Sequence, residues 1–337
     1  MNTTQERKSE LRIRLNMDFA PQGMELLTPG ATMHWKDCAF DLNPPPGGRA
    51  DFYVVLANAQ PIDQCIIPRN NSLLITGEPP EKKIYPRKFY AQFSHIVDTH
   101  FLSNNPNVHL SAPGLNWHVG LDLHSRIYRY GYDHLAALAY PDKENKIAVV
   151  CSDAAFTPGQ RKRLALLEFL KSRLGERMVH FGRGFTPIND KMDAILPYRF
   201  HLVLENSQSP HYWTEKLADA YLGWAFPLYM GCPNIREYFP DDSFETIDAG
   251  DFEAAHQRLL ALLDSPYDAA RIDAVASARE LVLNHYNPFA WSAYWAKKLY
   301  QEGPEKMLTI RTHKAFRPFP RGDLYRLRRR FTHKLGT

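Results

Sequence analysis

Residues 200–231 read FHLVLENSQSPHYWTEKLADAYLGWAFPLYMG, and this stretch decides the fold. The apolar runs at 200–205 and 226–231 are typical of buried strands, and residues 214–224 have the apolar spacing of a helix. A strand, a helix and a second strand in this order form the unit from which parallel sheets are built. The stretch therefore predicts an α/β fold.

The same alternation continues on both sides of this stretch. Short apolar runs predict three more strands, at 146–152, 177–182 and 243–248. Apolar residues at helical spacing predict four further helices, at 157–175, 251–264, 268–284 and 288–301. Such a sheet is covered by helices on both faces and binds ligands beyond the carboxyl ends of its strands, so we expect a site there.

The N-terminal half has less regular patterns. Residues 49–58 and 71–78 predict strands that end in polar turns, and 139–146 is a polar segment without periodicity. Placing the boundary in that segment predicts domains at 1–142 and 143–303, followed by a C-terminal tail at 304–337. We expect two Rossmann-like domains that face a central cleft.

Composition and residue spacing exclude several classes of protein. No run of about 18 apolar residues predicts a transmembrane helix, and the polar N-terminus lacks the apolar core of a secretory signal, so we expect a cytoplasmic protein. The cysteines have no CxxC spacing and the histidines no HExxH pattern, which predicts reduced thiols and no metal site. No dinucleotide-binding, P-loop or GxSxG motif is present, so dehydrogenases, P-loop enzymes and α/β-hydrolases are disfavoured.

The positive net charge of the chain, +4, is concentrated in its C-terminal tail. Residues 311–337 contain nine Lys or Arg and one Asp, so the rest of the chain is acidic and a nucleic-acid groove is disfavoured. From Leu324 onward, apolar residues recur at spacings of three and four, with basic residues between them. The tail therefore predicts a basic amphipathic helix that binds an anionic membrane surface. The alternatives are a segment that packs on the body and a disordered solubilising tail.

The polar cluster at 205–216, ENSQSPHYWTEK, lies between a predicted strand and the first turn of a predicted helix. The unpaired backbone N–H groups of a helix N-terminus favour an anion, and Lys216 adds a positive charge, so a phosphate fits this position. Glu215 would repel a phosphate, unless its carboxylate accepts hydrogen bonds from a ribose diol. The alternative is that Thr214 caps the helix, Glu215 favours the helix dipole and Lys216 is solvated.

Residues 200–244 resemble the signature of family 10 glycosyltransferases, the α1,3/α1,4-fucosyltransferases of bacteria and animals. That signature runs F-x-L-x-F-E-N-S, Y-x-T-E-K, P-(V/L)-Y-x-G, N and P-x-x-S-F, and nearly every element stands here in order. The sequence departs from it at Leu204, where the family has Phe, and at Glu245, where an apolar residue is commoner. A looser resemblance spans 49–300, and its acceptor half is weak.

The resemblance implies a GT-B fold whose C-terminal domain binds GDP-fucose without a required metal or other cofactor. It implies that Lys216 contacts the diphosphate and that Glu215 holds the ribose. Arg161 matches the phosphate-binding arginine of the family, with Arg163 as the near alternative. Asn206 and Tyr212 would orient the nucleotide sugar, and Glu205 would support the site.

Inverting transfer also needs a general base on the acceptor side. Glu78, at the end of the predicted strand 71–78, resembles the glutamate that the family has at such a strand end, and Glu81 is the second choice. A turn carboxylate bonded to local backbone is the alternative for Glu78. Trp117 and His118 resemble a loop near the acceptor, where they would stack on a sugar and bind a hydroxyl; packing is their alternative.

The function that the resemblance implies is transfer of L-fucose from GDP-fucose to a glycan acceptor. An α1,3 or α1,4 linkage to a GlcNAc- or glucose-containing cell-surface glycan or lipopolysaccharide is expected, with an oligosaccharide or a lipid-linked glycan as acceptor. A bacterial enzyme of this kind meets its acceptor at the cytoplasmic face of the inner membrane, where the basic tail would hold it peripherally. The alternatives are a different GDP-sugar donor and a non-catalytic glycan-binding relative. A nucleic-acid partner is not expected.

Overall fold

The computed structural model describes residues 10–103, 105–114, 116–153, 158–248 and 250–317. The chain divides into two compact units. Unit 1 comprises Met1–Ala20, Thr32–Pro113 and Phe289–Thr337, and unit 2 comprises Pro21–Ala31 and Gly114–Pro288. Among the helices of the described residues, none combines the length and the apolar character needed to cross a bilayer.

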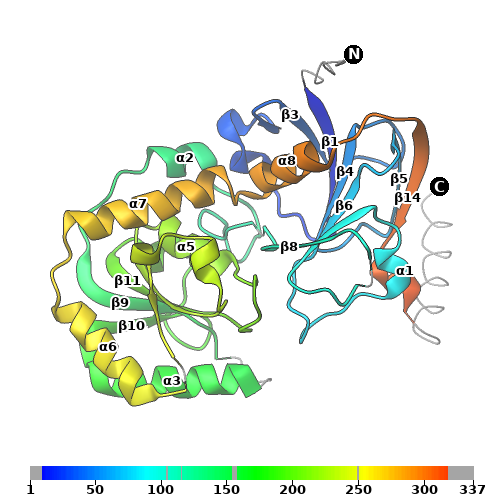
Figure 1. Cartoon of the computed structure of the whole chain (residues 1–337). Helices are drawn as coiled ribbons and strands as arrows, with labels where there is room; N and C mark the ends of the chain where they lie inside the picture. The colour runs from blue at the N-terminus through cyan, green and yellow to red at the C-terminus, as the bar shows by residue number, and fades with distance from the viewer. Residues whose placement is uncertain (1–9, 104, 115, 154–157, 249, 318–337) are drawn as a thin grey trace, which may run out of the picture. The chain divides into compact units, whose positions relative to one another are not determined.

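Unit 2 is built on a five-stranded parallel sheet in the order β10-β9-β11-β12-β13 (Figure 1). Its strands are β9 (Glu144–Val150), β10 (Met178–Phe181), β11 (Tyr198–Leu204), β12 (Phe226–Met230) and β13 (Glu245–Thr246). All five were predicted, although β13 has two residues where the sequence predicted six. Every residue of β12 is buried, which agrees with a central strand covered on both faces.

The helices of unit 2 cover both faces of this sheet. They are α2 (Tyr132–Ala137), α3 (Pro158–Leu174), α4 (Met192–Ile195), α5 (Glu215–Leu222), α6 (Phe252–Asp264) and α7 (Ala269–Asn284). In Figure 1, α5 and α7 pack together on one side of the sheet, and α3 and α6 pack together on the other. The predicted helices all form. The sequence did not predict α4, because a single turn of helix has too few residues to show a period.

Unit 1 is built on a seven-stranded sheet in the order β2-β3-β1-β4-β6-β7-β8. Its strands are β1 (Leu11–Asn16), β2 (His34–Trp35), β3 (Cys38–Leu42), β4 (Phe52–Leu56), β6 (Ser72–Ile75), β7 (His95–Asp98) and β8 (Val108–Leu110). All neighbouring strands are parallel except β2, which is antiparallel to β3. Two units, each built on a mainly parallel sheet, are the Rossmann-like pair of the GT-B class, so the predicted fold class is confirmed.

The boundaries of the two units differ from the predicted domains, 1–142 and 143–303. Residues from Gly114 onward belong to unit 2, since the backbone N–H groups of His118 and Val119 donate to Asp219 Oδ1 at 2.7 and 3.0 Å. The helix α8 (Pro288–Leu299) returns the chain to unit 1. The polar segment at 139–146 is a surface connection inside unit 2, because it runs into β9.

The predicted tail, 304–337, contains a strand of unit 1. β14 (Glu305–Arg311) pairs antiparallel with β5 (Ile62–Pro68), and Ile310 is fully buried. A short helical turn, η6 (His313–Phe316), follows it. The tail therefore belongs to the fold at least as far as Phe316, and the predicted amphipathic helix from Leu324 lies outside the described residues.

Candidate active site

The candidate site lies at the carboxyl end of β11, where the chain turns into α5. Glu205 directly follows β11, and its carboxylate accepts hydrogen bonds from the backbone N–H of Thr214 at 2.8 Å and from Thr214 Oγ1. Thr214 also caps α5, as the structural alternative had it, by accepting from the backbone N–H of Lys216. A Cβ on Gly231 would lie 2.6 Å from Glu205 Cγ, so glycine is required beside this turn.

The ammonium group of Lys216 is held inside this turn. Lys216 Nζ lies 3.1 Å from Thr214 Oγ1, 3.3 Å from Glu205 Oε2 and 3.4 Å from Glu215 Oε1. Burial lowers the pKa of Lys216, but the charges of Glu205 and Glu215 outweigh it and raise the pKa above its ordinary value. Lys216 is thus a fixed cation at the strand end, and the solvated alternative does not apply.

Glu215 lies among three positively charged or ionisable groups. Its Oε1 is 3.4 Å from Lys216 Nζ, 3.7 Å from Lys191 Nζ and 3.8 Å from His118 Nδ1. Burial raises the pKa of Glu215, whereas Lys216 and Lys191 lower it and leave it well below its usual range. The carboxylate therefore stays ionised and can accept hydrogen bonds from hydroxyl groups.

Lys191 and Asp219 belong to the same network, and sequence reasoning missed both. Lys191 Nζ donates to Asp219 Oδ2 at 2.7 Å, and the Asp219 side chain is 1% exposed. A signal for Asp219 exists in the sequence, because residues four apart on a helix share a face and Glu215 lies four residues earlier. Lys191 precedes α4 and has no comparable signal.

The arginine that faces the site is Arg163, which the sequence gave as the alternative to Arg161. Arg163 is buried, and its Nη1 donates to Asn206 Oδ1 at 2.8 Å. Its Nε is a buried donor without a hydrogen-bond partner among the described residues. Arg161 is exposed two positions earlier on α3, and residues two apart on a helix do not face the same side. This geometry favours Arg163, the alternative, as the phosphate-binding arginine, and the choice between the two arginines stays a prediction.

The loop between β11 and α5 holds the other predicted donor residues. Asn206 is exposed and Tyr212 is buried, and Tyr212 contributes to the raised pKa of Lys216. A second set of contacts shapes the loop at His211, whose Nδ1 lies 2.6 Å from Tyr238 Oη and whose backbone N–H donates to Asn234 Oδ1 at 2.7 Å. The structure therefore gathers Asn206, Tyr212, Glu215 and Lys216 on one loop and helix start.

Trp117 and His118, the predicted acceptor-side pair, have different surroundings from each other. Trp117 is 1% exposed, so its ring packs in the core of unit 2 and no face is open for stacking on a sugar. His118 lies beside the donor-site carboxylate Glu215. Burial, followed by the charge of Lys191, lowers the pKa of His118 to about 4, which keeps its ring neutral at pH 7.

The predicted base, Glu78, lies in unit 1 beyond the carboxyl end of β6. Its side chain is 29% exposed, and its Oε1 lies 2.7 Å from Lys82 Nζ. Glu81 is exposed on the same loop. Glu78 is thus accessible and stands at the edge of its sheet where parallel α/β folds bind ligands.

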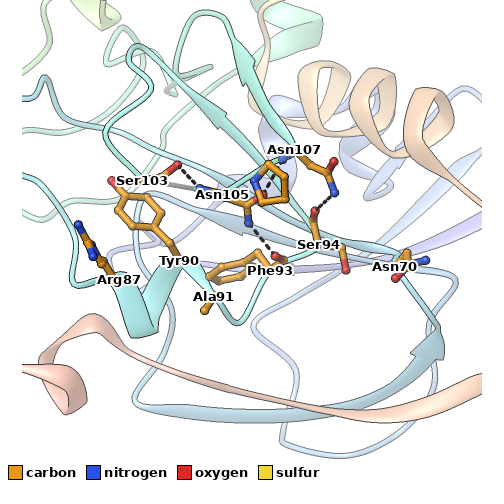
Figure 2. Close-up of a pocket in the computed structure, with 10 residues that line it drawn as sticks. Asn70, Arg87, Tyr90, Ala91, Phe93, Ser94, Ser103, Asn105 and Asn107 are labelled. Atoms are coloured by element: carbon orange, nitrogen blue, oxygen red, sulfur yellow. Dashed lines mark hydrogen bonds between the residues drawn. The ribbon is translucent and has the colours of Figure 1, made fainter.

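Unit 1 also has a pocket of about 460 Å³ at the opposite edge of its sheet (Figure 2). Asn70, Ser94 and Asn107 line it, and they precede β6, β7 and β8 respectively. Because these strands are parallel, the pocket lies at their amino ends and Glu78 beyond the carboxyl end of β6. It is therefore separate from the edge that carries the predicted base.

Neither metal nor disulfide chemistry gains support from the described residues. Within those ranges, no three His, Cys, Asp or Glu side chains gather as metal ligands. Cys38, Cys65, Cys151 and Cys232 are free and buried, as the sequence predicted. Among the described residues, Lys216, Lys191 and Arg163 place positive charge close to this strand end.

Two mainly parallel-sheet units, one with a cationic cluster at its strand ends, define a GT-B glycosyltransferase fold. Residues 140–269 match the family model described as "Glycosyltransferase family 10 (fucosyltransferase) C-term". This match confirms the resemblance to family 10 glycosyltransferases over residues 140–269.

Three curated relatives are similar to part of the chain. The 3-galactosyl-N-acetylglucosaminide 4-alpha-L-fucosyltransferase of Homo sapiens is 32% identical over 130 residues, which cover 36% of this chain and 35% of the relative. The 4-galactosyl-N-acetylglucosaminide 3-alpha-L-fucosyltransferase of Pan troglodytes is 28% identical, covering 39% and 37%. An alpha-(1,3)-fucosyltransferase of Helicobacter pylori is 33% identical over 89 residues, covering 24% and 19%. The matches thus span little more than a third of these relatives at most.

Solved structures are similar over a longer part of the chain but at lower identity. A crystal structure of an alpha1,3-fucosyltransferase with GDP has 17% sequence identity and a TM-score of 0.49, covering 90% of this chain and 95% of that one. A crystal structure of an alpha1,3-fucosyltransferase with GDP-fucose has 16% identity and a TM-score of 0.45, covering 83% and 85%.

Proposed function

We propose that this chain is an inverting glycosyltransferase that moves L-fucose from GDP-fucose to a hydroxyl group of a glycan acceptor. The observation that carries the proposal is the cluster at 205–216, because it lies inside the region that matches the family model and collects an ionised carboxylate with a fixed cation. The names of the curated relatives, all of them fucosyltransferases, support fucose as the sugar.

The donor would bind in unit 2. Glu215 accepts hydrogen bonds from the ribose diol, and Lys216 faces the diphosphate. Arg163 adds a guanidinium, whose planar group suits phosphate oxygens, and Asn206 and Tyr212 orient the nucleotide sugar. Positive groups stabilise the negative charge that develops on GDP as the bond to fucose breaks.

The acceptor would react from the side of unit 1. Glu78 takes the proton from the acceptor hydroxyl, the oxygen forms a bond to the anomeric carbon, and the carbon–oxygen bond to GDP breaks with the electron pair leaving on the diphosphate. Attack opposite to the leaving group inverts the configuration. The proposed base thus belongs to unit 1, and the proposed donor residues belong to unit 2.

The test of the donor is thermal unfolding with nucleotides. GDP should raise the melting temperature, with a stabilisation of about 2.7 kcal/mol at a hundredfold excess over its dissociation constant, and UDP and CDP should raise it less. Hydrolysis of several GDP-sugars, followed by a glycan acceptor array, then identifies the sugar and the linkage. No shift with millimolar GDP would contradict the donor assignment.

We also propose that transfer requires no metal, since side-chain cations face the place of the diphosphate. Activity should then survive EDTA with little change, and a divalent metal should at most stimulate it. Complete loss of activity on chelation, restored by manganese, would show that a metal holds the diphosphate.

A further inference from the structure

The lysine that would face the diphosphate has its charge already shared between two carboxylates. Lys216 Nζ lies 3.3 Å from Glu205 Oε2 and 3.4 Å from Glu215 Oε1. The Glu205 side chain has no exposure and that of Glu215 is 16% exposed, so water screens these charges weakly. The trio of Glu205, Glu215 and Lys216 carries a net charge of about −1 while both carboxylates are ionised, and burial raises the pKa of Glu205.

A diphosphate would meet unfavourable electrostatics at such a trio. Like charges a few Å apart in a partly buried site repel by about 4 kcal/mol at an effective dielectric constant near 20. An isolated helix N-terminus offsets only about 0.3–1 kcal/mol of this at an exposed position. A further cation close to Glu215 would therefore strengthen the attraction of Lys216 for an anion, in addition to the guanidinium of Arg163.

Lys191 is that cation. Its Nζ lies 3.7 Å from Glu215 Oε1, and its side chain is 12% exposed. Lys191, Lys216 and Asp219 line one small cavity of about 10 Å³, which has room for roughly one water molecule. The two lysines thus lie close to the same carboxylate oxygen, Glu215 Oε1.

Asp219 fixes the position of Lys191. One oxygen of Asp219, Oδ1, accepts the backbone N–H groups of His118 and Val119, and the other, Oδ2, accepts from Lys191 Nζ at 2.7 Å. Because the two backbone donors already stabilise the buried carboxylate, the pair leaves part of the Lys191 charge available to Glu215. This contact joins the N-terminal end of α4 to the middle of α5.

We propose that Lys191, held by Asp219, is a positioning residue of the donor site: it balances the charge of Glu215, so that Lys216 can attract the diphosphate of the nucleotide. The inference rests on the proposed function, since it takes GDP as the ligand. Lys191 lies outside the signature at 200–244, so the motif alone does not identify it.

The experiment compares three variants of the full chain by isothermal titration calorimetry with GDP and with guanosine, which lacks the phosphates. Lys191→Met removes the charge and keeps an aliphatic side chain, Lys191→Arg keeps the charge, and Lys171→Met removes an exposed charge on α3 as the control. We expect Lys191→Met to weaken GDP binding about tenfold or more, while guanosine binding changes less than about twofold. Lys191→Arg should restore most of the GDP affinity, and Lys171→Met should bind as wild type.

Two results would overturn the inference: equal GDP affinity in Lys191→Met and wild type, or an equal loss of GDP and guanosine binding, which would indicate a purely structural role. The loss of GDP affinity should also shrink at high salt, since the effect is electrostatic. Absence of GDP binding by the wild-type protein would contradict the proposed function itself, and with it the inference.

Discussion

The two units place their chemistry in different ways. In unit 2, the donor-side residues gather within one loop and one helix start, and contacts below 3.5 Å tie Glu205, Thr214, Glu215 and Lys216 together. In unit 1, the predicted base Glu78 stands on a surface loop with a nearby partner in Lys82. A compact set of buried, mutually bonded polar groups leaves a recognisable sequence motif, whereas a single carboxylate at a strand end does not.

This difference indicates which residues of such an enzyme determine its donor specificity and which determine its acceptor specificity. A nucleotide diphosphate is the same in every relative that uses it, so its residues can be packed into the fold. The acceptor varies between enzymes, and the residues that bind it lie on loops, which tolerate sequence change better than the sheet that carries them. The pocket of about 460 Å³ in unit 1 lies at the opposite edge of the sheet from Glu78.

The largest effect is expected from a change at Glu78. Glu78→Gln should lower the transfer rate about 10²- to 10⁴-fold, because a general base is lost, and should leave GDP affinity near wild type. Single-turnover transfer and GDP titration measure the two effects. Glu81→Gln is the matched control on the same loop. Near-normal transfer by Glu78→Gln with a loss in Glu81→Gln would move the role of base to Glu81.

The donor side should respond in both binding and turnover. Lys216→Ala and Arg163→Ala should each weaken GDP binding about 10-fold to 10²-fold and lower turnover as well, since each removes a cation from the phosphate side. Arg161→Ala should have a much smaller effect, because Arg161 is exposed on α3. A larger loss from Arg161→Ala than from Arg163→Ala would assign the phosphate contact to Arg161.

The sequence predicted the sheet of unit 2 more completely than that of unit 1, for a physical reason. In unit 2, four strands of four to seven residues alternate with helices of up to 17 residues, so most elements show their period; the two-residue β13 and the single turn of α4 do not. In unit 1, β2 has two residues and β8 three, and β5 finds its partner β14 more than 230 residues later in the chain. Pairing over such a distance leaves no local pattern.

The sequence predicted those parts of the candidate site whose residues are close together in the chain. Asn206, Tyr212, Glu215 and Lys216 come together because they are neighbours in the chain. Arg163 could not be separated from Arg161 by spacing alone, since only the packing of α3 against the sheet decides which side chain turns inward. Lys191 reaches Glu215 through tertiary structure, and Trp117 needed the burial of its ring to be assigned to packing.

The two units can also be compared through one buried histidine in each. Burial lowers the pKa of His201 in unit 2 and of His313 in unit 1 to about 3, so both rings are neutral in the folded state. In the unfolded chain, a histidine binds a proton near pH 6.5. The contribution of each buried neutral ring to the free energy of unfolding is therefore complete above pH 6.5. It falls by up to about 1.4 kcal/mol per pH unit as the pH is lowered towards 3.

Calorimetric melting at pH 7 and pH 5 measures this effect. His201→Gln and His313→Gln should each reduce the drop in melting temperature between the two pH values, because glutamine does not titrate. An exposed histidine, His124, gives the control variant His124→Gln, which should leave the drop unchanged. An unaltered drop in both buried variants would show that other groups cause the acid sensitivity.

The smallest effect on catalysis is expected from the end of the chain, and it tests whether unit 1 carries a membrane contact as well as the base. We propose that the basic segment from Arg321 binds anionic membranes, which would place the protein at the cytoplasmic face of the inner membrane, near a lipid-linked acceptor. Because β14 and η6 belong to unit 1, the truncation must fall after Arg317 to leave the fold intact.

The full chain should sediment with vesicles that contain anionic lipid, less so at high salt, and the chain ending at Arg317 should not. Both should transfer fucose to a soluble acceptor at similar rates. Equal vesicle binding by the two chains would refute the membrane contact, and loss of transfer by the shorter chain would assign the segment to the fold.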